Sequence, residues 1–490
     1  YKGGIYPVNP SADEILGLKV YKSVLDIPHP VDAAAITVPA KFVLDIAKEC
    51  GQKGVKGLIV ITSGFSEVGD VEAEKELVRI AHENGMRVLG PNVVGTLSNS
   101  DDLNASFAPF LPLDGSASLV SQSGALLIAM DAITYTRRIG FDKMVSIGNM
   151  SDVNFADTVA WLNEDENTKC ITLYIEGLKD GPGFIHESAK ASKPIVVLKA
   201  GVSEHGAAAA ASHTGSLAGS QKIYGAAFKQ AGVIQATDLG DLFDTTLALS
   251  LQPPMQGENV LVLTNGGGVG VLATDSAEKA GIPMKFAPES VQEELRKHMP
   301  SFGSAKNPVD LTGMAGNEWY YDTTNFSFAH DWVDGLVILY CETAMTNPME
   351  IAKAIHKAIV ETGITDKPVT VSFVGGERSD KAMQWLVENG IPAYNAPDLA
   401  VKAMGALREY ARLADLKKEP LTEDHSVDKQ TVLDIINKVR QDGRTGMTEI
   451  ESKKIFTAYC LPVVKTEIAT SEEEAVSIAK QTRNIVWQNI

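Results

Sequence analysis

The sequence predicts an α/β protein built from several doubly wound parallel sheets, for three reasons. Short uncharged runs rich in Val and Ile alternate with amphipathic helical patterns as far as about residue 416. Several of these runs end in turns of Gly, Ser, Asn or Pro, at the ends of strands where such sheets bind ligands. The length of 490 residues, at about 150 residues per domain, allows three or four domains.

The first predicted domain covers residues 1–112 and contains four apolar runs that we expect to be strands, at 5–10, 33–39, 57–62 and 86–92. Helical patterns at 40–50 and 70–84 separate them. Because ligands bind at the carboxyl ends of such strands, three turns are expected to form a binding edge: Val38-Pro39-Ala40, Thr62-Ser63-Gly64 and Gly90-Pro91-Asn92. The domain begins with YPVNP and lacks the usual first strand and glycine turn, so we expect its front to be missing from this sequence.

A second α/β domain is predicted over residues 113–252. A strand at 118–120 leads into the turn 121–124 (SQSG) and a helix from Ala125, and later strands end at Asn149 and Glu176. Free N–H groups at such a helix start bind anions readily. The alternative for this turn is an ordinary N-cap made by Ser123. The apolar residues 126–128 are expected to line a pocket for a small or medium acid beside the helix start.

Residues 201–220, GVSEHGAAAAASHTGSLAGS, lie between a predicted strand at 194–200 and a helical pattern that opens near Gln221. The stretch offers little apolar side chain to bury, and glycines and serines interrupt it, so we expect a mobile loop. Hydroxyl side chains surround His213, and an imidazole in such a place can accept and release a phosphoryl group near neutral pH. The alternative is a solvent-exposed loop histidine, which is also our interpretation of His205.

A third domain of the same design is predicted over residues 257–416. Its strand at 259–264 feeds the glycine turn 265–270 and then a helix. No Walker lysine follows this turn, so the sequence does not support a P-loop nucleotide site. A doubly charged phosphoryl group between the two helix starts would gain about 0.3 to 1 kcal/mol from each helix dipole.

The last part of the chain is predicted to be a charged linker at 417–430 and a further, incomplete domain at 431–490. Thr448 and Glu451 stand in capping-box register at the start of a predicted helix there.

Charge and cysteine content argue against several classes of protein. The balance of 44 Lys and Arg against 62 Asp and Glu gives a net charge of −18, and no basic stripe with aromatics appears, so we expect no nucleic-acid partner. The 4 cysteines are far apart, without a CxxC pair or a histidine at ligand spacing, so neither a metal site nor a disulfide framework is expected. No apolar run approaches the length of a membrane span. A cytoplasmic protein without membrane contact is expected.

Several separated stretches share one family's pattern: YPVNP (6–10), ITSGFSE (61–67), GPNVVG (90–95), LVSQSG (119–124), IEG (175–177), ASHTGSLAG (211–219), TNGGGVGVLATD (264–275) and NPVDLTG (307–313). Together they resemble the ADP-forming (nucleoside-diphosphate-forming) acyl-CoA synthetases, which are relatives of succinyl-CoA synthetase and include the ADP-forming acetyl-CoA synthetases. The resemblance covers nearly the whole chain, and residues 448–479 resemble the entry segment of the family's ATP-grasp domain. It implies a CoA-binding Rossmann-like domain, two flavodoxin-like domains and the start of an ATP-grasp domain.

The resemblance implies a reversible acid-thiol ligase. Such an enzyme forms acyl-CoA from a carboxylic acid, coenzyme A and ATP, and releases ADP and phosphate by way of an acyl phosphate and a phosphohistidine. His213 matches the phosphorylated histidine, and Glu176 matches the carboxylate that orients it. The implied phosphate-binding residues are Ser123, Gly124, Asn149, Gly267 and Gly268. The implied CoA contacts are Asn9, Pro10, Val38, Pro39, Ile61, Thr62 and Ser63.

The family also implies an ATP or ADP site with Mg²⁺ in the ATP-grasp domain, whose ligands we do not expect within this sequence, and a homodimer. Two other functions stay open: a protein acetyltransferase homologue whose synthetase-like region senses acyl-CoA, and an assembly module whose glycine turns only pack helices on strands. A serine hydrolase using Ser121 or Ser123 is weakly supported, because the turn is not GxSxG.

Overall fold

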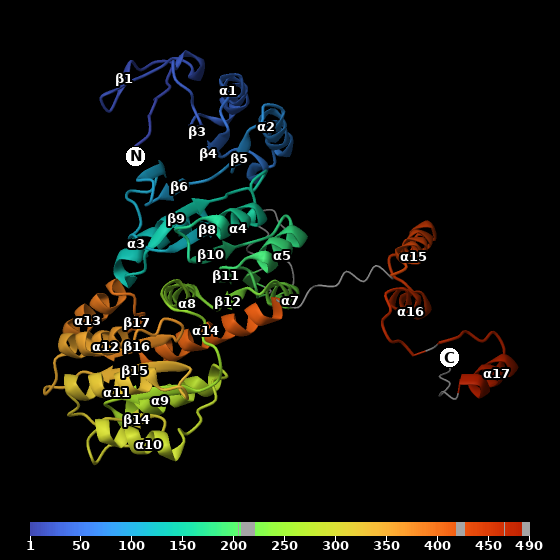
Figure 1. Cartoon of the computed structure of the whole chain (residues 1–490). Helices are drawn as coiled ribbons and strands as arrows, with labels where there is room; N and C mark the ends of the chain where they lie inside the picture. The colour runs from blue at the N-terminus through green and yellow to red at the C-terminus, as the bar shows by residue number, and fades with distance from the viewer. Residues whose placement is uncertain (204, 207–220, 418–426, 465, 483–490) are drawn as a thin grey trace. The chain divides into compact units, whose positions relative to one another are not determined.

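The structure, a computed structural model, describes residues 1–203, 205–206, 221–417, 427–464 and 466–482. The chain divides into two compact units, Tyr1–Lys418 and Glu419–Ile490 (Figure 1). Within the described ranges, the first unit contains a three-stranded, a seven-stranded and a five-stranded sheet together with a short antiparallel hairpin. The predicted α/β class is therefore confirmed.

The first domain is organised on a parallel sheet with the strand order β3-β4-β5. Its main elements are β3 (Ala33–Ile36), α1 (Ala40–Lys53), β4 (Gly57–Val60), η2 (Ser66–Val68), α2 (Val71–Glu83) and β5 (Arg87–Leu89). The amphipathic spacing of α1 and α2 turns their apolar side chains onto the sheet, where they form one core with Leu58, Val60 and Val88. The strands and helices predicted between residues 33 and 92 are thereby confirmed.

The apolar run at 5–10 is not a strand, so this prediction was wrong. Val8 makes only an isolated bridge to Tyr21, because Pro7 and Pro10 have no N–H group for a ladder. The segment continues into the hairpin β1 (Glu14–Ile15) and β2 (Leu18–Lys19) and the short helix η1 (Val24–Asp26). Tyr21 packs against the core of the first domain, so the segment covers that domain without extending its sheet.

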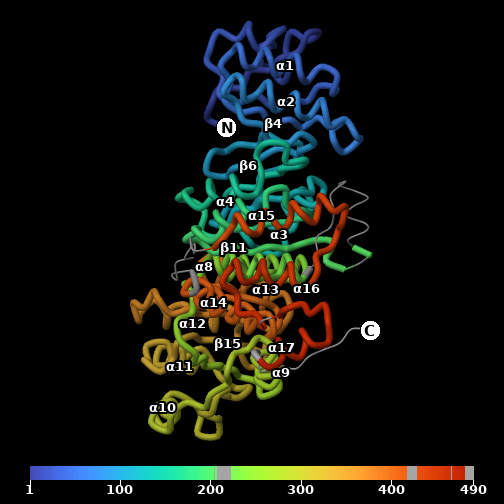
Figure 2. The backbone as a smooth tube through the Cα atoms, turned by 90° about the vertical axis from the view of Figure 1, so that its right-hand side faces the viewer, coloured from blue at the N-terminus to red at the C-terminus, as the bar shows by residue number. Residues whose placement is uncertain are grey.

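The second domain is a mixed sheet with the strand order β12-β11-β10-β8-β9-β6-β7. Its strands are β6 (Gly95–Ser98), β7 (Leu103–Ser106), β8 (Ala117–Ser121), β9 (Phe141–Ser146), β10 (Cys170–Ile175), β11 (Ile195–Lys199) and β12 (Ile234–Ala236). The strands from β12 to β9 are parallel, whereas β6 and β7 are antiparallel additions. Strands β6 and β7 both lie within residues 1–112, which were predicted to form the first domain, yet they extend the sheet of the second domain. Two views show β6 next to the first domain (Figures 1 and 2).

Helices cover both faces of this second sheet. On one face α4 (Phe155–Glu164), α5 (Gly181–Lys190) and α7 (Gln221–Ala231) pack through Phe155, Phe184 and Phe228. On the other face lie α3 (Gly124–Arg137) and α8 (Leu239–Leu251), which pack through Leu127 and Leu242. Alternate residues of the strands enter the two cores, which is why these strands read as continuous apolar runs in the sequence.

The third domain is a parallel sheet with the strand order β14-β13-β15-β16-β17. Its strands are β13 (Val260–Thr264), β14 (Val309–Asp310), β15 (Gly335–Cys341), β16 (Val369–Val374) and β17 (Ala393–Tyr394). Its helices are α9 (Gly267–Lys279), α10 (Glu289–Leu295), η3 (Arg296–His298), α11 (Asn317–Ala329), α12 (Pro348–Thr362), α13 (Glu377–Glu388) and α14 (Pro397–Lys417). This order repeats β9-β8-β10-β11-β12 of the second domain. The glycine turns after β8 and β13 therefore occupy equivalent places in the two domains.

The second and third domains share one hydrophobic core. Helix α14 packs against α8 of the second domain and against α9 and β16 of the third (Figure 1). Leu242 and Leu247 of α8 belong to the same buried cluster as Met404 and Leu407 of α14. This continuous burial joins the two domains through apolar contact along α14.

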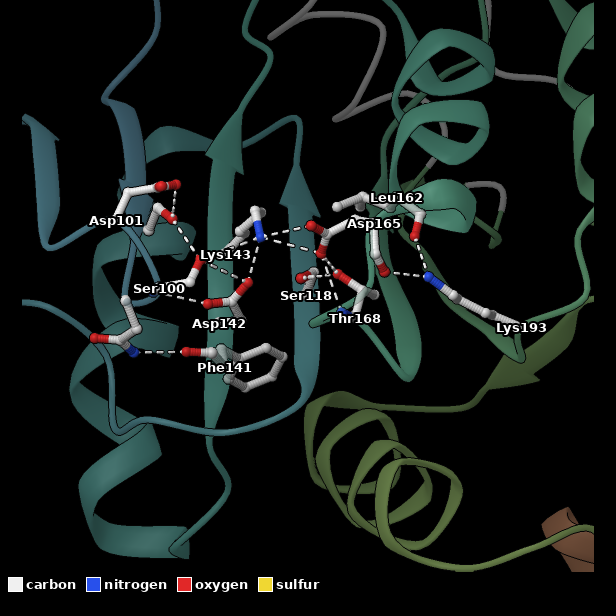
Figure 3. A network of polar contacts seen from close by, with 12 residues as sticks. Ser100, Asp101, Ser118, Phe141, Asp142, Lys143, Leu162, Asp165, Thr168 and Lys193 are labelled. Atoms are coloured by element: carbon white, nitrogen blue, oxygen red, sulfur yellow. Dashed lines mark hydrogen bonds and ion pairs between the residues drawn. The ribbon is translucent and has the colours of Figure 1, made fainter.

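A buried polar network is centred on Lys143 in β9 of the second sheet (Figure 3). The Lys143 ammonium lies between the carboxylates of Asp142 and Asp165, and both Asp165 oxygens are 3.0 Å from Nζ. Asp142 also accepts the Ser100 N–H at 2.9 Å, and Asp165 accepts the Thr168 N–H at 3.0 Å. The network thus joins the beginning of β9 to the β6–β7 loop and to the loop after α4. It lies away from the carboxyl ends of the parallel strands, where ligands of such sheets bind.

The second unit contains α15 (Lys429–Gln441), α16 (Glu449–Ala458) and α17 (Glu472–Thr482). Thr448 and Glu451 form the predicted capping box at the start of α16, and Arg444 pairs with Glu451 at 2.7 Å. α15 packs on α16. Across the described ranges, no helix has both the length and the apolar character needed to cross a membrane.

Candidate active site

The structure brings the three predicted turns of the first domain together at the carboxyl edge of β3 and β4. The Thr62 hydroxyl donates to the Val38 carbonyl at 2.6 Å, and the Asn92 N–H donates to the Thr62 carbonyl at 3.1 Å. Pro39 and Ser63 are exposed beside them, whereas Ile61 is half-buried. The edge therefore presents backbone and hydroxyl groups to solvent, a surface suited to a narrow polar ligand.

Asn9 and Pro10, the other predicted CoA contacts, lie in a separate turn. The Asn9 side chain accepts the N–H groups of Ser11 at 2.9 Å and Ala12 at 3.1 Å, and its own N–H donates to the Tyr21 carbonyl at 2.9 Å. Asn9 thus stabilises the path of the N-terminal segment, and its contact with a ligand stays a prediction.

Ser123 and Gly124 stand at the start of α3, after β8. Ser123 is the N-cap, and its hydroxyl accepts the Leu126 N–H at 3.4 Å. The expected N-cap is therefore present, and it is compatible with an anion at the first N–H groups of the helix, which have no intrahelical acceptor. A Cβ on Gly124 would lie 2.6 Å from a methyl of Val94, so packing excludes a side chain there. Leu127 is wholly buried in the core, so the prediction that it lines a pocket was wrong.

Glu176 follows the last residue of β10 and is bonded to the α3 turn through its backbone. The N–H groups of Glu176 and Gly177 both donate to the Gln122 side-chain oxygen at 2.9 Å. The Gln122 N–H in turn donates to the Tyr174 carbonyl at 3.1 Å. Burial and then the nearby Glu176 charge raise the pKa of Tyr174. The structure therefore brings the backbone of Glu176 and the predicted phosphate turn to the same edge of the sheet, and Gln122, which the sequence analysis missed, joins them.

Lys199 is a second residue beside Glu176 that the sequence analysis missed. It ends β11, and its ammonium donates to the Glu176 carbonyl at 2.8 Å and to the Ala200 carbonyl. The ammonium also lies 4.6 Å from the centre of the Tyr224 ring. The only signal in the sequence was a lysine at the end of an otherwise apolar strand.

His213 lies outside the described residues, so its predicted role stays a prediction. Described residues on both sides of its segment make defined contacts. The Ala200 carbonyl accepts a hydrogen bond from the Lys199 ammonium, and the Tyr224 hydroxyl in α7 accepts the Leu178 N–H at 3.4 Å. Ala200 before the segment 201–220 and Tyr224 beyond it therefore both lie near the Glu176 strand end.

Asn149, predicted to bind phosphate, makes its side-chain hydrogen bonds toward the first domain. Its amide nitrogen lies 2.6 Å from a Glu67 carboxylate oxygen, 2.9 Å from Glu74 and 3.2 Å from the Ser66 hydroxyl. Burial alone would raise the pKa of Glu67, but hydrogen bonds from Gly64, Asn149 and the local backbone hold it below its usual value. Asn149 therefore fastens the β9–α4 loop to the first domain, and its binding of phosphate stays a prediction.

Asp152 makes a second polar attachment between these domains. Its carboxylate accepts the Val88 N–H at 2.7 Å, the Arg87 side chain at 2.9 Å and the His82 ring nitrogen at 3.0 Å. Burial opposes ionisation, but these partners keep the pKa of Asp152 below its usual value. Asp152 lies three residues after Asn149, so this stretch connects the first domain to the candidate site.

The second glycine turn begins α9 of the third domain. Gly266 is the N-cap, Gly267 and Gly268 are exposed, and a Cβ on Gly268 would meet nothing within 4 Å. An oxygen of the Asp310 carboxylate lies 3.3 Å from the place of a Cβ on Gly267. The turn is open to a ligand but already has one negative charge beside it. Nowhere in the described ranges do three or more His, Cys, Asp or Glu side chains form a group that could hold a metal ion.

Four family models match the chain, one after another. They are the CoA binding domain at residues 2–98, the succinyl-CoA ligase like flavodoxin domain at 114–249, the Ligase-CoA domain at 260–418 and the ATP-grasp domain at 438–486. The matched order agrees with the succession of sheets in the first unit.

Curated relatives and a solved structure match most of the chain. The alpha subunit of ADP-forming acetate-CoA ligase I from Pyrococcus furiosus is 48% identical over 86% of this chain and 92% of its own length. ADP-forming acetate-CoA ligase from Methanocaldococcus jannaschii is 39% identical over 100% of this chain and 70% of its own length. The solved structure is acetyl-coenzyme A synthetase 1 of Candidatus Korarchaeum cryptofilum, described as dinucleotide-forming, in complex with phosphate and ADP. It aligns with a TM-score of 0.83 and 48% identity over 86% of this chain and 91% of its own.

Proposed function

The chain belongs to the family of ADP-forming acyl-CoA ligases, and from this premise we propose that it joins a small monocarboxylic acid to CoA while ATP is cleaved to ADP and phosphate. Relatives named for acetate reach 48% identity, whereas one named for 4-hydroxybutyrate reaches 32%. Acetate is therefore the first substrate to test, and the reaction is reversible. We further propose ATP or ADP with Mg²⁺ at the ATP-grasp domain, a homodimeric assembly and a cytoplasmic location.

The proposed chemistry passes phosphate through His213. After the histidine has received the γ-phosphoryl group of ATP, the acid's carboxylate oxygen attacks phosphorus and the P–N bond breaks, which gives an acyl phosphate. The CoA sulfur, as thiolate, then attacks the acyl carbon, and the C–O bond to phosphate breaks to release phosphate and thioester. Glu176 accepts a hydrogen bond from one imidazole nitrogen, which fixes the tautomer and stabilises the cationic ring.

The remaining roles follow from the position of each group. The N–H groups at the start of α3 hold the phosphate, because they are positive and have no acceptor within the helix. The edge formed by Val38, Thr62 and Ser63 holds the narrow arm of CoA. The single observation that best supports the proposal is the pair of 2.9 Å hydrogen bonds from the Glu176 and Gly177 N–H groups to Gln122, because they hold the backbone of the proposed orienting residue next to the turn proposed to bind phosphate.

The proposal is tested by phosphorylating the full-length protein from either direction. Labelled ATP with Mg²⁺, or acetyl-CoA with labelled phosphate, is expected to give an acid-labile, base-stable label that disappears in His213→Ala. His205→Ala is the matched control in the same segment and keeps the label. Absence of label in the wild-type protein from both directions rejects the proposed function and favours a sensing or assembly role.

Glu176→Ala is expected to keep the fold and to slow phosphorylation by about 10²- to 10⁴-fold, by analogy with loss of the carboxylate that orients a catalytic histidine. Rapid-quench measurement of the label checks this result. A rate equal to that of the wild type removes Glu176 from the mechanism.

A further inference from the structure

Lys199 is a buried cation at the edge where the candidate site lies. It is the last residue of β11, is aligned with Ile175 of β10, and has an exposed fraction of 4%. An apolar side chain would fill this place without the cost of removing an ammonium group from water. The presence of a lysine therefore needs a reason beyond packing.

The ammonium and Gln122 hold the Glu176 backbone from opposite sides. Gln122 accepts the N–H groups of Glu176 and Gly177, while Lys199 donates to the Glu176 carbonyl at 2.8 Å. The two peptide groups that flank the Cα of Glu176 are thus held by one side chain from the turn after β8 and one from the end of β11. This arrangement restricts the direction in which the Glu176 side chain leaves the backbone.

The same ammonium contacts described residues on both sides of the segment that carries His213. It donates to the carbonyl of Ala200, directly before residues 201–220, and it lies over the ring of Tyr224, four residues after them. A cation over an aromatic ring contributes about 0.5 to 2 kcal/mol, more when it is removed from water. One side chain therefore connects the Glu176 strand end to Ala200 and Tyr224, which flank the segment.

We propose that Lys199 is a positioning residue that fixes the Glu176 backbone relative to Ala200 and Tyr224, the described residues that flank the segment 201–220. The inference rests on the proposed function, in which Glu176 orients the histidine of that segment. Lys199 itself does not touch the reacting atoms. Burial lowers the pKa of Lys199, while the Glu176 charge opposes this, so the nearby carboxylate favours the cation.

The chain offers a matched control at the other end of the same strand. Lys193 precedes β11, and its ammonium also donates to two backbone carbonyls, Leu162 at 2.9 Å and Asp165. Burial lowers the pKa of Lys193 as well. A role limited to stabilising the fold therefore predicts similar effects for both lysines, whereas the positioning role predicts an effect on phosphorylation for Lys199 alone.

The test measures the phosphorylation rate of the full-length protein with acetyl-CoA and labelled phosphate. Lys199→Met, which keeps the aliphatic stem, is expected to slow phosphorylation by about 10- to 100-fold, the usual cost of removing a group that orients a functional residue. Lys199→Arg keeps the charge and recovers part of the rate. Lys193→Met keeps the wild-type rate. In a Glu176→Gln background, Lys199→Met produces no further decrease, because it acts through Glu176.

Three results overturn the inference: a wild-type rate in Lys199→Met, equal slowing in Lys193→Met, or a full additional decrease in the Glu176→Gln background. Amide hydrogen exchange gives a readout without turnover, in which Gly177 exchanges faster in Lys199→Met than in Lys193→Met. If the wild-type protein takes no label, the proposed function fails, and the amide exchange rate of Gly177 alone tests the positioning role of Lys199. In that case, an exchange rate at Gly177 that Lys199→Met leaves unchanged overturns the inference.

Discussion

Asp131 provides a quantitative test of the structure, because its carboxylate is buried on α3 without a hydrogen-bond partner among the described residues. The side chain has an exposed fraction of 0%, and neither carboxylate oxygen has a hydrogen-bond partner within the described part of the chain. Removal from water disfavours the charged form and raises the pKa of Asp131 from 3.8 to about 6. At about 1.36 kcal/mol for each pKa unit, ionisation at neutral pH costs the folded protein about 3 kcal/mol.

The sign of the pH dependence follows from this raised value. The folded protein binds the proton more tightly than the unfolded chain, so this contribution to stability is present below pH 3.8 and is lost as the pH rises through about 6. Asp131→Asn has nearly the same shape and no charge. It is expected to raise the free energy of unfolding by about 3 kcal/mol at pH 7.5 and by about half as much at pH 5.

Urea unfolding of the wild type and Asp131→Asn at several pH values, followed by circular dichroism, measures this difference. Asp275→Asn is the control, because Asp275 is exposed on α9, the equivalent helix of the third domain, and is expected to change stability by less than about 0.5 kcal/mol. If Asp131→Asn lowers stability by a similar amount at every pH, the carboxylate has a partner and the reasoning is refuted.

Three further outcomes are expected. Lys143→Met leaves the buried Asp142 and the half-buried Asp165 carboxylates without their cation and lowers the free energy of unfolding by about 3 to 5 kcal/mol, and a loss below about 1 kcal/mol in denaturant titration would contradict this network. Asp152→Asn loosens the first domain at Arg87 and increases its cleavage in limited proteolysis at pH 7. Because the pKa of Asp152 lies below its usual value, the wild-type attachment is present at neutral pH and is lost as the pH falls, so equal cleavage of both proteins at pH 7 would count against it. Thr448→Ala removes the capping box with Glu451 and lowers the stability of α16 by about 1 kcal/mol, which hydrogen exchange of that helix measures against Thr457→Ala near its other end.

Most of the predicted architecture could be read from local patterns. Buried parallel strands are continuous apolar runs, and amphipathic helices keep their own period, so both are visible within a few residues of sequence. The glycine turns and the short motifs between them also identify the family, and the relatives confirm that identification. The run at 5–10 was misread because its prolines remove the donors that a strand needs.

The sequence by itself determined the α/β class, the order of the domains, the family and the positions of Glu176 and of both helix starts, because each depends on neighbouring residues. Only the tertiary structure decided which partners these residues have. It directed the amide of Asn149 to Glu67 and Glu74, placed Leu127 in the core, and brought Gln122 and Lys199 to the two sides of the Glu176 backbone. These contacts join residues far apart in the chain, and no local pattern encodes them, because they arise only when strands, helices and loops from different positions in the sequence pack together, as β8, β10 and β11 do in one sheet.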